Sequence, residues 1–287
     1  MDATTIITQI FLPISLAIIM FGMGLTLVFN DFARLFTYPK EVFIGLCNQL
    51  VFLPLIGFLI IILFDLNSSM AIGVMILSLC PGGPTSNLIT QVAKGNIGLS
   101  VTLTALASLI TVFTIPIILS KAITYFTGET GVVIELPLIQ TMIQILVITV
   151  IPVSIGMVIR KKNQAFAIRM ERPMRIASTV LFVIIFLLVM IANKDLIVQA
   201  MKEVGLATLI LNLSTMALGY ITAKVFYIKG KSQISITIES GIQNGTLAFV
   251  IATTILKNVE MGLPTGAYSI WMFITGGILM WRLGGSK

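Results

Sequence analysis

Long apolar stretches separated by short polar segments dominate this chain. A helix needs about 20 residues to cross the ~30 Å hydrocarbon core of a bilayer, and nine stretches reach or approach that length. They are Ile6–Phe29, Val42–Phe64, Met70–Val92, Ile97–Ser120, Leu138–Ile159, Ile176–Asn193, Val204–Ile228, Ser232–Leu256 and Gly266–Trp281. The pattern predicts an all-α polytopic membrane protein with about nine transmembrane helices.

The composition indicates that this chain lies in a lipid bilayer, which is its main partner. Of its 287 residues, 57% are hydrophobic and 10% are charged, whereas a soluble domain carries about 25% charged residues. A chain so poor in charge could not cover a water-exposed surface, which excludes a soluble enzyme, a nucleic-acid binder and a disordered adaptor. We expect no obligate protein partner. Cys47 and Cys80 lie inside apolar stretches and are expected to be buried free thiols.

Basic residues predict the orientation, because Lys and Arg gather on the cytoplasmic side of membrane proteins. With the N-terminus outside and the C-terminus cytoplasmic, 14 of the 18 basic residues fall on the inner side. The cluster Arg160–Arg175 then anchors the topology, and the net charge of +7 needs no acidic partner. We therefore expect a multi-pass protein of the cell (inner) membrane.

One acidic residue lies at membrane depth. Ten of the eleven Asp and Glu residues fall in loops or at helix ends, but Glu239 lies within the eighth apolar stretch. A carboxylate there costs at least ~2.5 kcal/mol unless it is paired or solvated, so such residues usually mark an ion or proton pathway. A neutral, merely hydrogen-bonded acid is the structural alternative. Pairing with a basic residue is disfavoured, because no Lys or Arg lies near the middle of a stretch.

Two of the stretches carry helix-breaking residues. Gly241 and Gly245 flank the polar segment after Glu239, and the third stretch contains Pro81-Gly82-Gly83-Pro84. Proline and glycine destabilise helix interiors, and irregular backbone is tolerated at membrane depth only where it lines a cavity or binds an ion. We expect both helices to break.

The two breaks occupy comparable positions. Each broken stretch precedes one intact helix, Ile97–Ser120 or Gly266–Trp281, and the predicted topology gives the two broken stretches opposite directions. This arrangement predicts an inverted-topology repeat whose broken helices cross at the midplane, near Ser86, Asn87 and Glu239. Interrupted helices at matching positions indicate the binding site of a secondary transporter.

Neutral oxygen-bearing side chains accompany the single carboxylate. Ser100 and Thr104 share one helix face, and Gln49 lies midway along the second stretch. One carboxylate with such oxygens suits a monovalent cation such as sodium better than calcium, although Glu239 could instead carry a proton. An intramembrane enzyme is disfavoured because the chain has no histidine and no paired acids. A channel is disfavoured because no ring of charge could form a filter.

Four motifs resemble the bile acid:sodium symporter family, in its bacterial branch. They are Phe21-Gly22-Met23-Gly24-Leu25, Gly82-Gly83-Pro84-Thr85-Ser86-Asn87, Lys94-Gly95-Asn96-Ile97-Gly98-Leu99-Ser100 and Glu239-Ser240-Gly241-Ile242-Gln243-Asn244. The resemblance implies a panel domain, 1–36 with 137–194, and a core domain, 40–121 with 204–287. It also implies nine helices, where bacterial members usually have ten.

The resemblance further implies two sodium ions and no organic cofactor. By position, the first sodium site would use Ser86, Asn87, Ser100, Thr104 and Glu239. The second would use Gln49, Glu239, Gln243 and the backbone carbonyls of Ser240 and Ile242.

The solute side departs from the family pattern. Pro84 replaces a small hydroxyl residue, Leu211 replaces a histidine beside Asn212, and Met272-Phe273 replaces a His-Asn pair. Such a site has fewer hydrogen-bond donors, which favours a more apolar solute or weaker binding. We take Thr85, Asn244 and Ser269 as candidate solute contacts, with helix packing as the equal alternative.

Together these features predict a sodium-coupled secondary transporter that imports a small or amphipathic organic anion by alternating access. The alternative is a proton-coupled organic anion carrier with Glu239 as its proton site.

Overall fold

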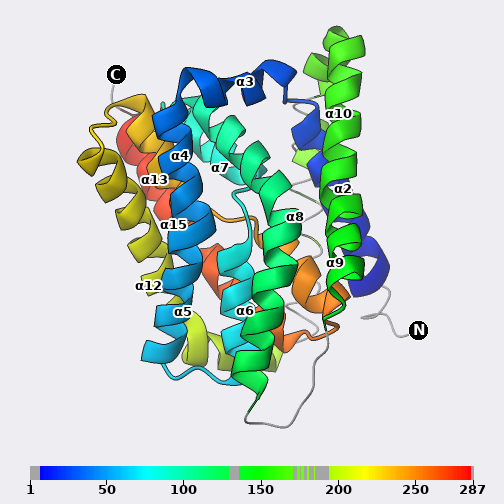
Figure 1. The fold of residues 1–287 in the computed structure, drawn as a ribbon, viewed down its shortest axis with the longest axis vertical. Coiled ribbons are helices and arrows are strands. Elements are labelled where there is room, and N and C mark those ends of the chain that lie inside the picture. The colour runs from blue at the N-terminus through cyan, green and yellow to red at the C-terminus, as the bar shows by residue number, and fades with distance from the viewer. Residues whose placement is uncertain are drawn as a thin grey trace.

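A computed structural model describes residues 7–128, 136–170 and 194–285, together with 173–174, 176–177, 180 and 184. Helices joined by short connections make up these ranges (Figure 1). The elements are η1 (Ile7–Phe11), α2 (Leu12–Gly24), α3 (Phe29–Thr37), α4 (Pro39–Cys47), η2 (Asn48–Phe52), α5 (Leu53–Leu63), α6 (Ser68–Leu79), α7 (Pro84–Val92), α8 (Ile97–Thr127), α9 (Leu138–Ile145), η3 (Leu146–Val150), α10 (Ile151–Lys162), α12 (Lys194–Val225), α13 (Lys231–Gly241), α14 (Gly245–Val250), η4 (Ile251–Ile255), η5 (Glu260–Gly262) and α15 (Leu263–Gly284).

The prediction of an all-helical membrane protein is confirmed. Within the described ranges, five helices are long and apolar enough to cross a membrane: Pro39–Leu63, Ile97–Thr127, Leu138–Lys162, Met201–Val225 and Glu260–Gly284. A sixth candidate is the bent pair Gln9–Gly24 and Phe29–Thr37. Two further predicted spans are broken helices, and the predicted span Ile176–Asn193 lies almost entirely outside the described residues. The count of nine therefore stays a prediction.

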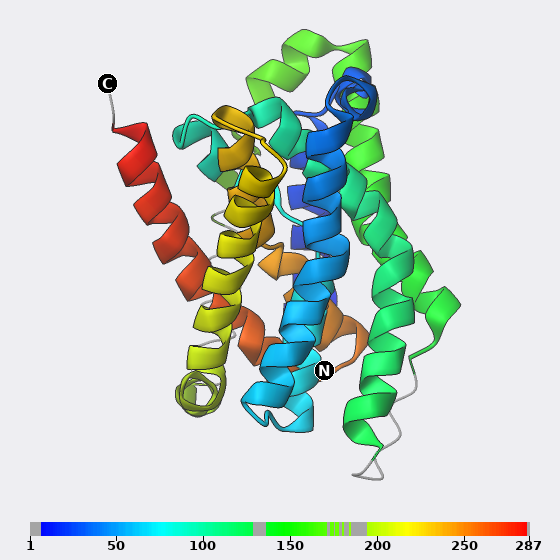
Figure 2. The ribbon, with the colours of Figure 1, turned by 60° about the vertical axis from the view of Figure 1, so that its left-hand side comes forward.

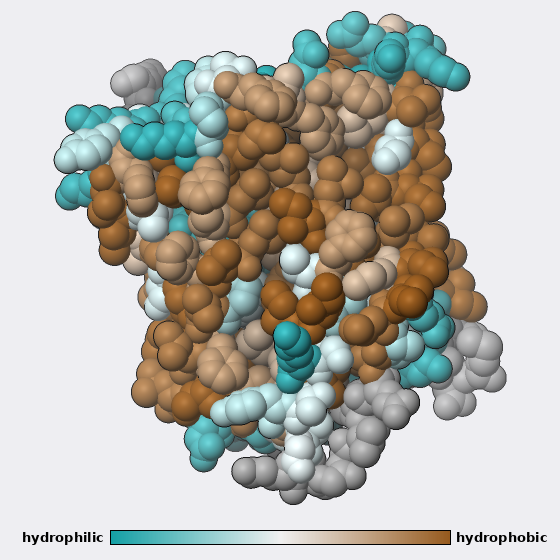
Figure 3. Space-filling view, in the orientation of Figure 1, coloured by the Kyte–Doolittle hydropathy of each residue, from teal (hydrophilic) through white to brown (hydrophobic). Residues whose placement is uncertain are grey.

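The surface has the pattern that a bilayer requires. Figure 3 shows hydrophobic residues across the middle of one face, with hydrophilic residues gathered toward its two ends. Large apolar side chains stay exposed on the long helices, among them Leu59, Phe113 and Ile139. Such a surface is stable against lipid tails and would be costly in water.

Asparagine caps define where several of these helices begin. The side chains of Asn67, Asn96 and Asn244 accept hydrogen bonds from backbone N–H groups three residues ahead, at 3.0, 3.1 and 3.0 Å. A helix leaves its first N–H groups without internal partners, and a side-chain oxygen at the cap satisfies one of them. The sequence thus sets the starts of α6, α8 and α14.

The first predicted span, Ile6–Phe29, is shorter than its apolar pattern suggested. Helix α2 ends at Gly24, and α3 leaves it at an angle of 67°. The Asp31 carboxylate accepts the Val28 N–H at 2.8 Å, and the Thr102 hydroxyl donates to the Asp31 carbonyl at 2.8 Å. These bonds start α3 and fasten it to α8, so α3 lies across one end of the helix bundle (Figure 1).

Glycines let α2 and α10 pack in direct backbone contact. A Cβ atom on Gly24 would overlap the Val153 carbonyl, and one on Gly156 would lie 2.8 Å from the Gly24 Cα. Small residues at helix contacts are typical of membrane proteins, because close approach maximises van der Waals contact. This contact joins helices far apart in the sequence.

Candidate cation site

The two predicted breaks are confirmed, and they lie against each other. Helix α6 ends at Leu79 and α7 begins at Pro84, while α13 ends at Gly241 and α14 begins at Gly245. Gly82 and Gln243 form an isolated antiparallel bridge, and the Asn244 N–H donates to the Pro81 carbonyl at 2.8 Å. The two broken helices run in opposite directions (Figures 1 and 2). Four helix ends therefore meet inside the protein.

The Glu239 carboxylate lies at this meeting point with 1% of its surface exposed. Oε1 accepts the Ser100 hydroxyl, and Oε2 accepts the Thr104 hydroxyl at 3.0 Å and the Gln49 amide at 3.3 Å. These three donors are neutral, and within the described part of the chain no Lys or Arg forms an ion pair with Glu239. A buried carboxylate without a counter-charge is costly. A cation or a proton must therefore accompany it.

Gly82 is required by the close approach of these groups. A Cβ atom at this position would overlap Glu239 Oε2 and would lie 3.3 Å from both Gln49 Nε2 and Ser86 Oγ. Three polar groups therefore converge on the space that a side chain would fill. The α6–α7 break brings its backbone directly against the carboxylate.

Two buried amide oxygens beside Glu239 have no hydrogen-bond donor. They are Gln49 Oε1 and Gln243 Oε1, and each residue is 1% exposed. The two amide nitrogens are anchored, because Gln49 Nε2 donates to the Glu239 carbonyl at 2.9 Å and Gln243 Nε2 to the Ser240 carbonyl at 3.0 Å. Buried acceptors without partners are rare in native proteins. A bound cation or an ordered water molecule would give these oxygens a partner.

The residues expected to form the first site are brought together here. The Ser100 hydroxyl lies between the Glu239 carboxylate and Asn87 Oδ1, which is 2.8 Å away, and Thr104 contacts the same carboxylate. The Ser86 hydroxyl donates to the Gly83 carbonyl at 2.7 Å. For the second site, Gln49, Glu239, Ser240 and Gln243 are joined by the hydrogen bonds described above, and Ile242 lies in the break between α13 and α14.

The three candidate solute contacts surround the breaks, but two of them have local partners. Asn244 caps α14, and the Ser269 hydroxyl donates to the Thr265 carbonyl at 2.8 Å. Thr85 is half-buried in the first turn of α7. These hydrogen bonds of Asn244 and Ser269 agree with the alternative interpretation, in which the two side chains stabilise helix structure and do not contact the solute.

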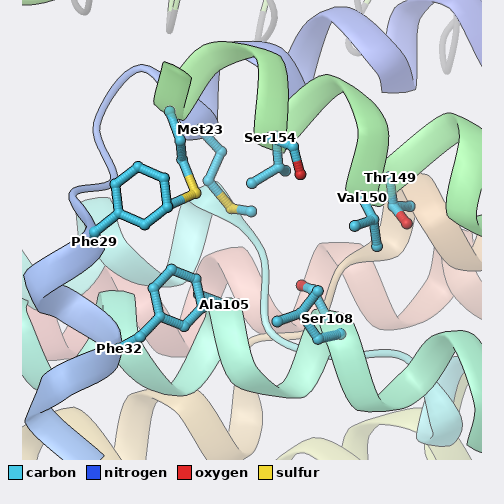
Figure 4. A pocket seen from close by; sticks show the side chains of 11 residues that line it. Met23, Phe29, Phe32, Ala105, Ser108, Thr149, Val150 and Ser154 are labelled. Atoms are coloured by element: carbon cyan, nitrogen blue, oxygen red, sulfur yellow. The ribbon is translucent and has the colours of Figure 1, made fainter. Parts of the chain in front are cut away.

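A cavity of about 330 Å³ lies between α2, α3, α8, η3 and α10 (Figure 4). Its lining is mostly apolar and includes Phe29 and Phe32, with hydroxyls from Ser108, Thr149 and Ser154. The Ser108 hydroxyl donates to the Thr104 carbonyl at 2.7 Å, so one turn of α8 connects the cavity wall to the Glu239 site. Sequence reasoning missed this cavity, because its wall comes from separate helices without a shared motif.

Three buried polar residues around the breaks were not predicted as site residues, although the family pattern placed Asn212 on the solute side. Asn48 precedes Gln49, and its Oδ1 has no hydrogen-bond donor. Asn212 and Tyr268 both donate to the Gly241 carbonyl, at 2.8 Å each. The sequence does contain a signal for these three residues, because each is a polar or tyrosine side chain within an apolar stretch.

Known proteins resemble this chain over most of its length. The model of the sodium bile acid symporter family matches residues 13–200. A probable sodium/metabolite cotransporter of Arabidopsis thaliana chloroplasts is 30% identical over 277 residues, covering 96% of this chain and 67% of the relative. An uncharacterized sodium-dependent transporter of Bacillus subtilis is 30% identical over 271 residues, covering 94% and 81%. The human ileal sodium/bile acid cotransporter is 28% identical over 247 residues, covering 86% and 70%.

These matches agree with a helical membrane protein whose two broken helices enclose a buried carboxylate. The relatives named above are sodium-coupled or sodium-dependent transporters, and none is an enzyme. The chain therefore belongs to the sodium bile acid symporter family, a family of sodium-dependent transporters.

Proposed function

We propose that this protein is a sodium-coupled secondary transporter that imports a small or amphipathic organic anion. The observation that carries the proposal is the buried Glu239 carboxylate beside the unpartnered oxygens of Gln49 and Gln243. Sodium at this point would neutralise the carboxylate and satisfy both amide oxygens. A proton could neutralise the carboxylate, but it supplies a single O–H donor, so at least one of the two amide oxygens would keep no partner.

The donor set is consistent with two sodium ions that share Glu239. The first would lie among Ser86, Asn87, Ser100, Thr104 and Glu239, and the second among Gln49, Glu239, Gln243 and the carbonyls of Ser240 and Ile242. One carboxylate with neutral oxygens favours a monovalent cation, since calcium usually recruits several carboxylates. Among the described residues, no three His, Cys, Asp or Glu side chains gather as a metal site.

Sodium would drive transport by binding one conformation more tightly than the other. It would hold the two breaks together while the core domain, 40–121 with 204–287, moves against the panel domain, 1–36 with 137–194. The antiparallel broken helices, followed by α8 and α15, support an inverted-topology repeat, the usual framework for such motion. Because α3 is bonded to α8 of the core domain, the hinge would lie at the bend between α2 and α3, and α3 would move with the core domain although the range 1–36 assigns it to the panel domain.

The apolar cavity between these two groups of helices is the proposed place for the body of the solute. Its few hydroxyls and mostly apolar lining suit a molecule with few polar groups; Leu211 and Met272-Phe273 do not line it. Backbone N–H groups at the start of α7, near Thr85, would attract a carboxylate of the solute. The protein would lie in the cell membrane with its N-terminus outside, so that its basic residues face the cytoplasm.

A sodium titration of thermal stability tests the ion site directly. The purified protein is heated in detergent at fixed ionic strength, with choline or potassium replacing sodium. A ligand that binds only the folded state stabilises it by RT ln(1 + [L]/Kd), about 2.7 kcal/mol at 100 times Kd. We expect a saturable, sodium-specific rise that is lost in Glu239→Gln and Gln243→Ala. Gln91→Ala is the matched control, because this exposed glutamine lies on α7 away from Glu239.

Uptake into proteoliposomes completes the test. A sodium gradient should drive accumulation of an organic anion, and replacing sodium by choline should abolish it. If a proton gradient alone drives uptake and sodium leaves the melting temperature unchanged, the proton carrier replaces this proposal.

A further inference from the structure

The end of α13 exposes three successive carbonyls, and side chains hold all of them. Gln49 Nε2 donates to the Glu239 carbonyl at 2.9 Å, and Gln243 Nε2 donates to the Ser240 carbonyl at 3.0 Å. Asn212 Nδ2 and the Tyr268 hydroxyl both donate to the Gly241 carbonyl, at 2.8 Å each. Buried backbone acceptors need partners, so this break is stabilised by named side chains.

The break itself removes the usual helix partners. In a continuous helix, the N–H groups of Asn244 and Gly245 would bond the carbonyls of Ser240 and Gly241. Here the Asn244 N–H donates to the Pro81 carbonyl at 2.8 Å, and the Gly245 N–H donates to the Gln243 carbonyl at 3.0 Å. The Gly241 carbonyl therefore depends on side chains from other helices.

Those side chains form a buried network across α12 and α15. Asn212 and Tyr268 have essentially no exposed surface. The Thr275 hydroxyl donates to Asn212 Oδ1 at 2.8 Å, which fixes the amide so that its nitrogen faces Gly241. Two donors occupy both lone pairs of the Gly241 carbonyl. Thr275, Asn212, the Gly241 carbonyl and Tyr268 thus each have a hydrogen-bond partner within this network. Networks in which every polar group is hydrogen-bonded are rigid.

Gly241 is the residue at which the backbone most needs this support. A Cβ atom here would overlap Met216 of α12, so the close contact between the helices requires glycine. Glycine is also the most flexible residue. Gly241 lies directly between Ser240 and Ile242, whose carbonyls are the proposed backbone ligands of the second sodium ion. Its own peptide plane sets where those neighbouring carbonyls point.

We propose that Asn212 and Tyr268 are positioning residues for the second sodium site. They bind the Gly241 carbonyl and hold the backbone on either side in the conformation that receives the ion, without touching the ion. This inference rests on the proposed function. It adds two residues from α12 and α15 that act on sodium affinity through the backbone.

The test measures the sodium concentration that gives half-maximal thermal stabilisation of the full-length protein in detergent. Tyr268→Phe removes one oxygen and keeps the ring, and Asn212→Leu keeps the size of the side chain without its donor. Each variant should raise the midpoint about fivefold, the equivalent of one lost hydrogen bond of about 1 kcal/mol. Thr208→Val is the control, because this buried hydroxyl of α12 bonds the Val204 carbonyl away from the break.

A purely structural role would give a different result. The control should lower the melting temperature in choline but leave the sodium midpoint within twofold of the native value. If Tyr268→Phe and Asn212→Leu behave like this control, the positioning role is wrong, while the sodium site stands. If the native protein shows no sodium response at all, the proposed function fails first and this inference fails with it.

Discussion

Replacing Gly82 by alanine adds a single methyl group against the Glu239 carboxylate. The new Cβ atom would overlap Oε2 of Glu239 and press on Gln49 Nε2 and Ser86 Oγ, each 3.3 Å away. Backbone lies on one side of this contact and the buried carboxylate on the other. The carboxylate must therefore move, and the hydrogen bonds from Thr104 and Gln49 to Oε2 weaken.

The size of the effect follows from those contacts. Overpacking a buried site costs about 1–3 kcal/mol, and a hydrogen bond to a charged group contributes about 1.5–3 kcal/mol. We expect the sodium-bound state to lose about 3 kcal/mol, which corresponds to sodium binding about 100-fold weaker. When choline replaces sodium, the melting temperature of Gly82→Ala should differ less from that of the native protein, because neither protein then has an ion bound to the carboxylate.

The neighbouring glycine provides a matched control for this assay. A Cβ atom on Gly83 would lie 3.4 Å from the Asn244 Cα, an ordinary contact, and its backbone is extended. Gly83→Ala should keep a sodium midpoint close to that of the native protein in the same thermal titration. A native sodium midpoint in Gly82→Ala would refute the placement of the ion beside Oε2.

Three other changes test the cavity, the helix contact and the carboxylate. Val150→Trp should fill the cavity and abolish solute uptake while sodium still stabilises the protein, whereas Val147→Trp, on the exposed side of η3, should leave uptake intact. Gly156→Ala should lower thermal stability by about 2 kcal/mol or more, because α2 leaves no room for a methyl group; Gly277→Ala, which meets open space, should be neutral by the same melting assay. Ser100→Ala removes a donor to Glu239 and should weaken sodium binding about tenfold or more in the titration.

Local backbone chemistry made the breaks predictable. Pro81-Gly82-Gly83-Pro84 cannot continue a helix, and Gly241 and Gly245 bracket a polar segment in an apolar span, so both interruptions were evident from residue type. The position of Glu239 at membrane depth was also predictable, because the residue lies within an apolar stretch long enough to span the bilayer. The sequence could therefore predict which residues converge on the carboxylate.

Features that depend on tertiary contact could not be predicted in this way. The apolar pattern continues through Leu25, Leu27, Val28 and Phe29, but α2 ends at Gly24. Tertiary contacts fix this end: Arg160 of α10 donates to the Leu25 carbonyl at 2.8 Å, and the Asp31 cap starts α3 against α8. The cavity is a second example. Its wall comes from several helices, and packing sets how each helix is rotated toward the others, so no periodic pattern in the sequence predicts which side chains line it. From the sequence, Tyr268 is equally well explained as a packing residue. Only the structure shows that its hydroxyl donates to the Gly241 carbonyl.

Gln49 and Glu239 lie 190 positions apart, so the ribosome finishes the first group of helices long before the acid that completes the site is made. During that interval the break after α6 has neither Asn244 nor Gln243 beside it. An unsatisfied backbone group in hydrocarbon costs several kcal/mol, so α6 and α7 cannot rest in the bilayer in their final arrangement. We expect α6 and α7 to reach their final arrangement only once the α13–α14 break lies beside them.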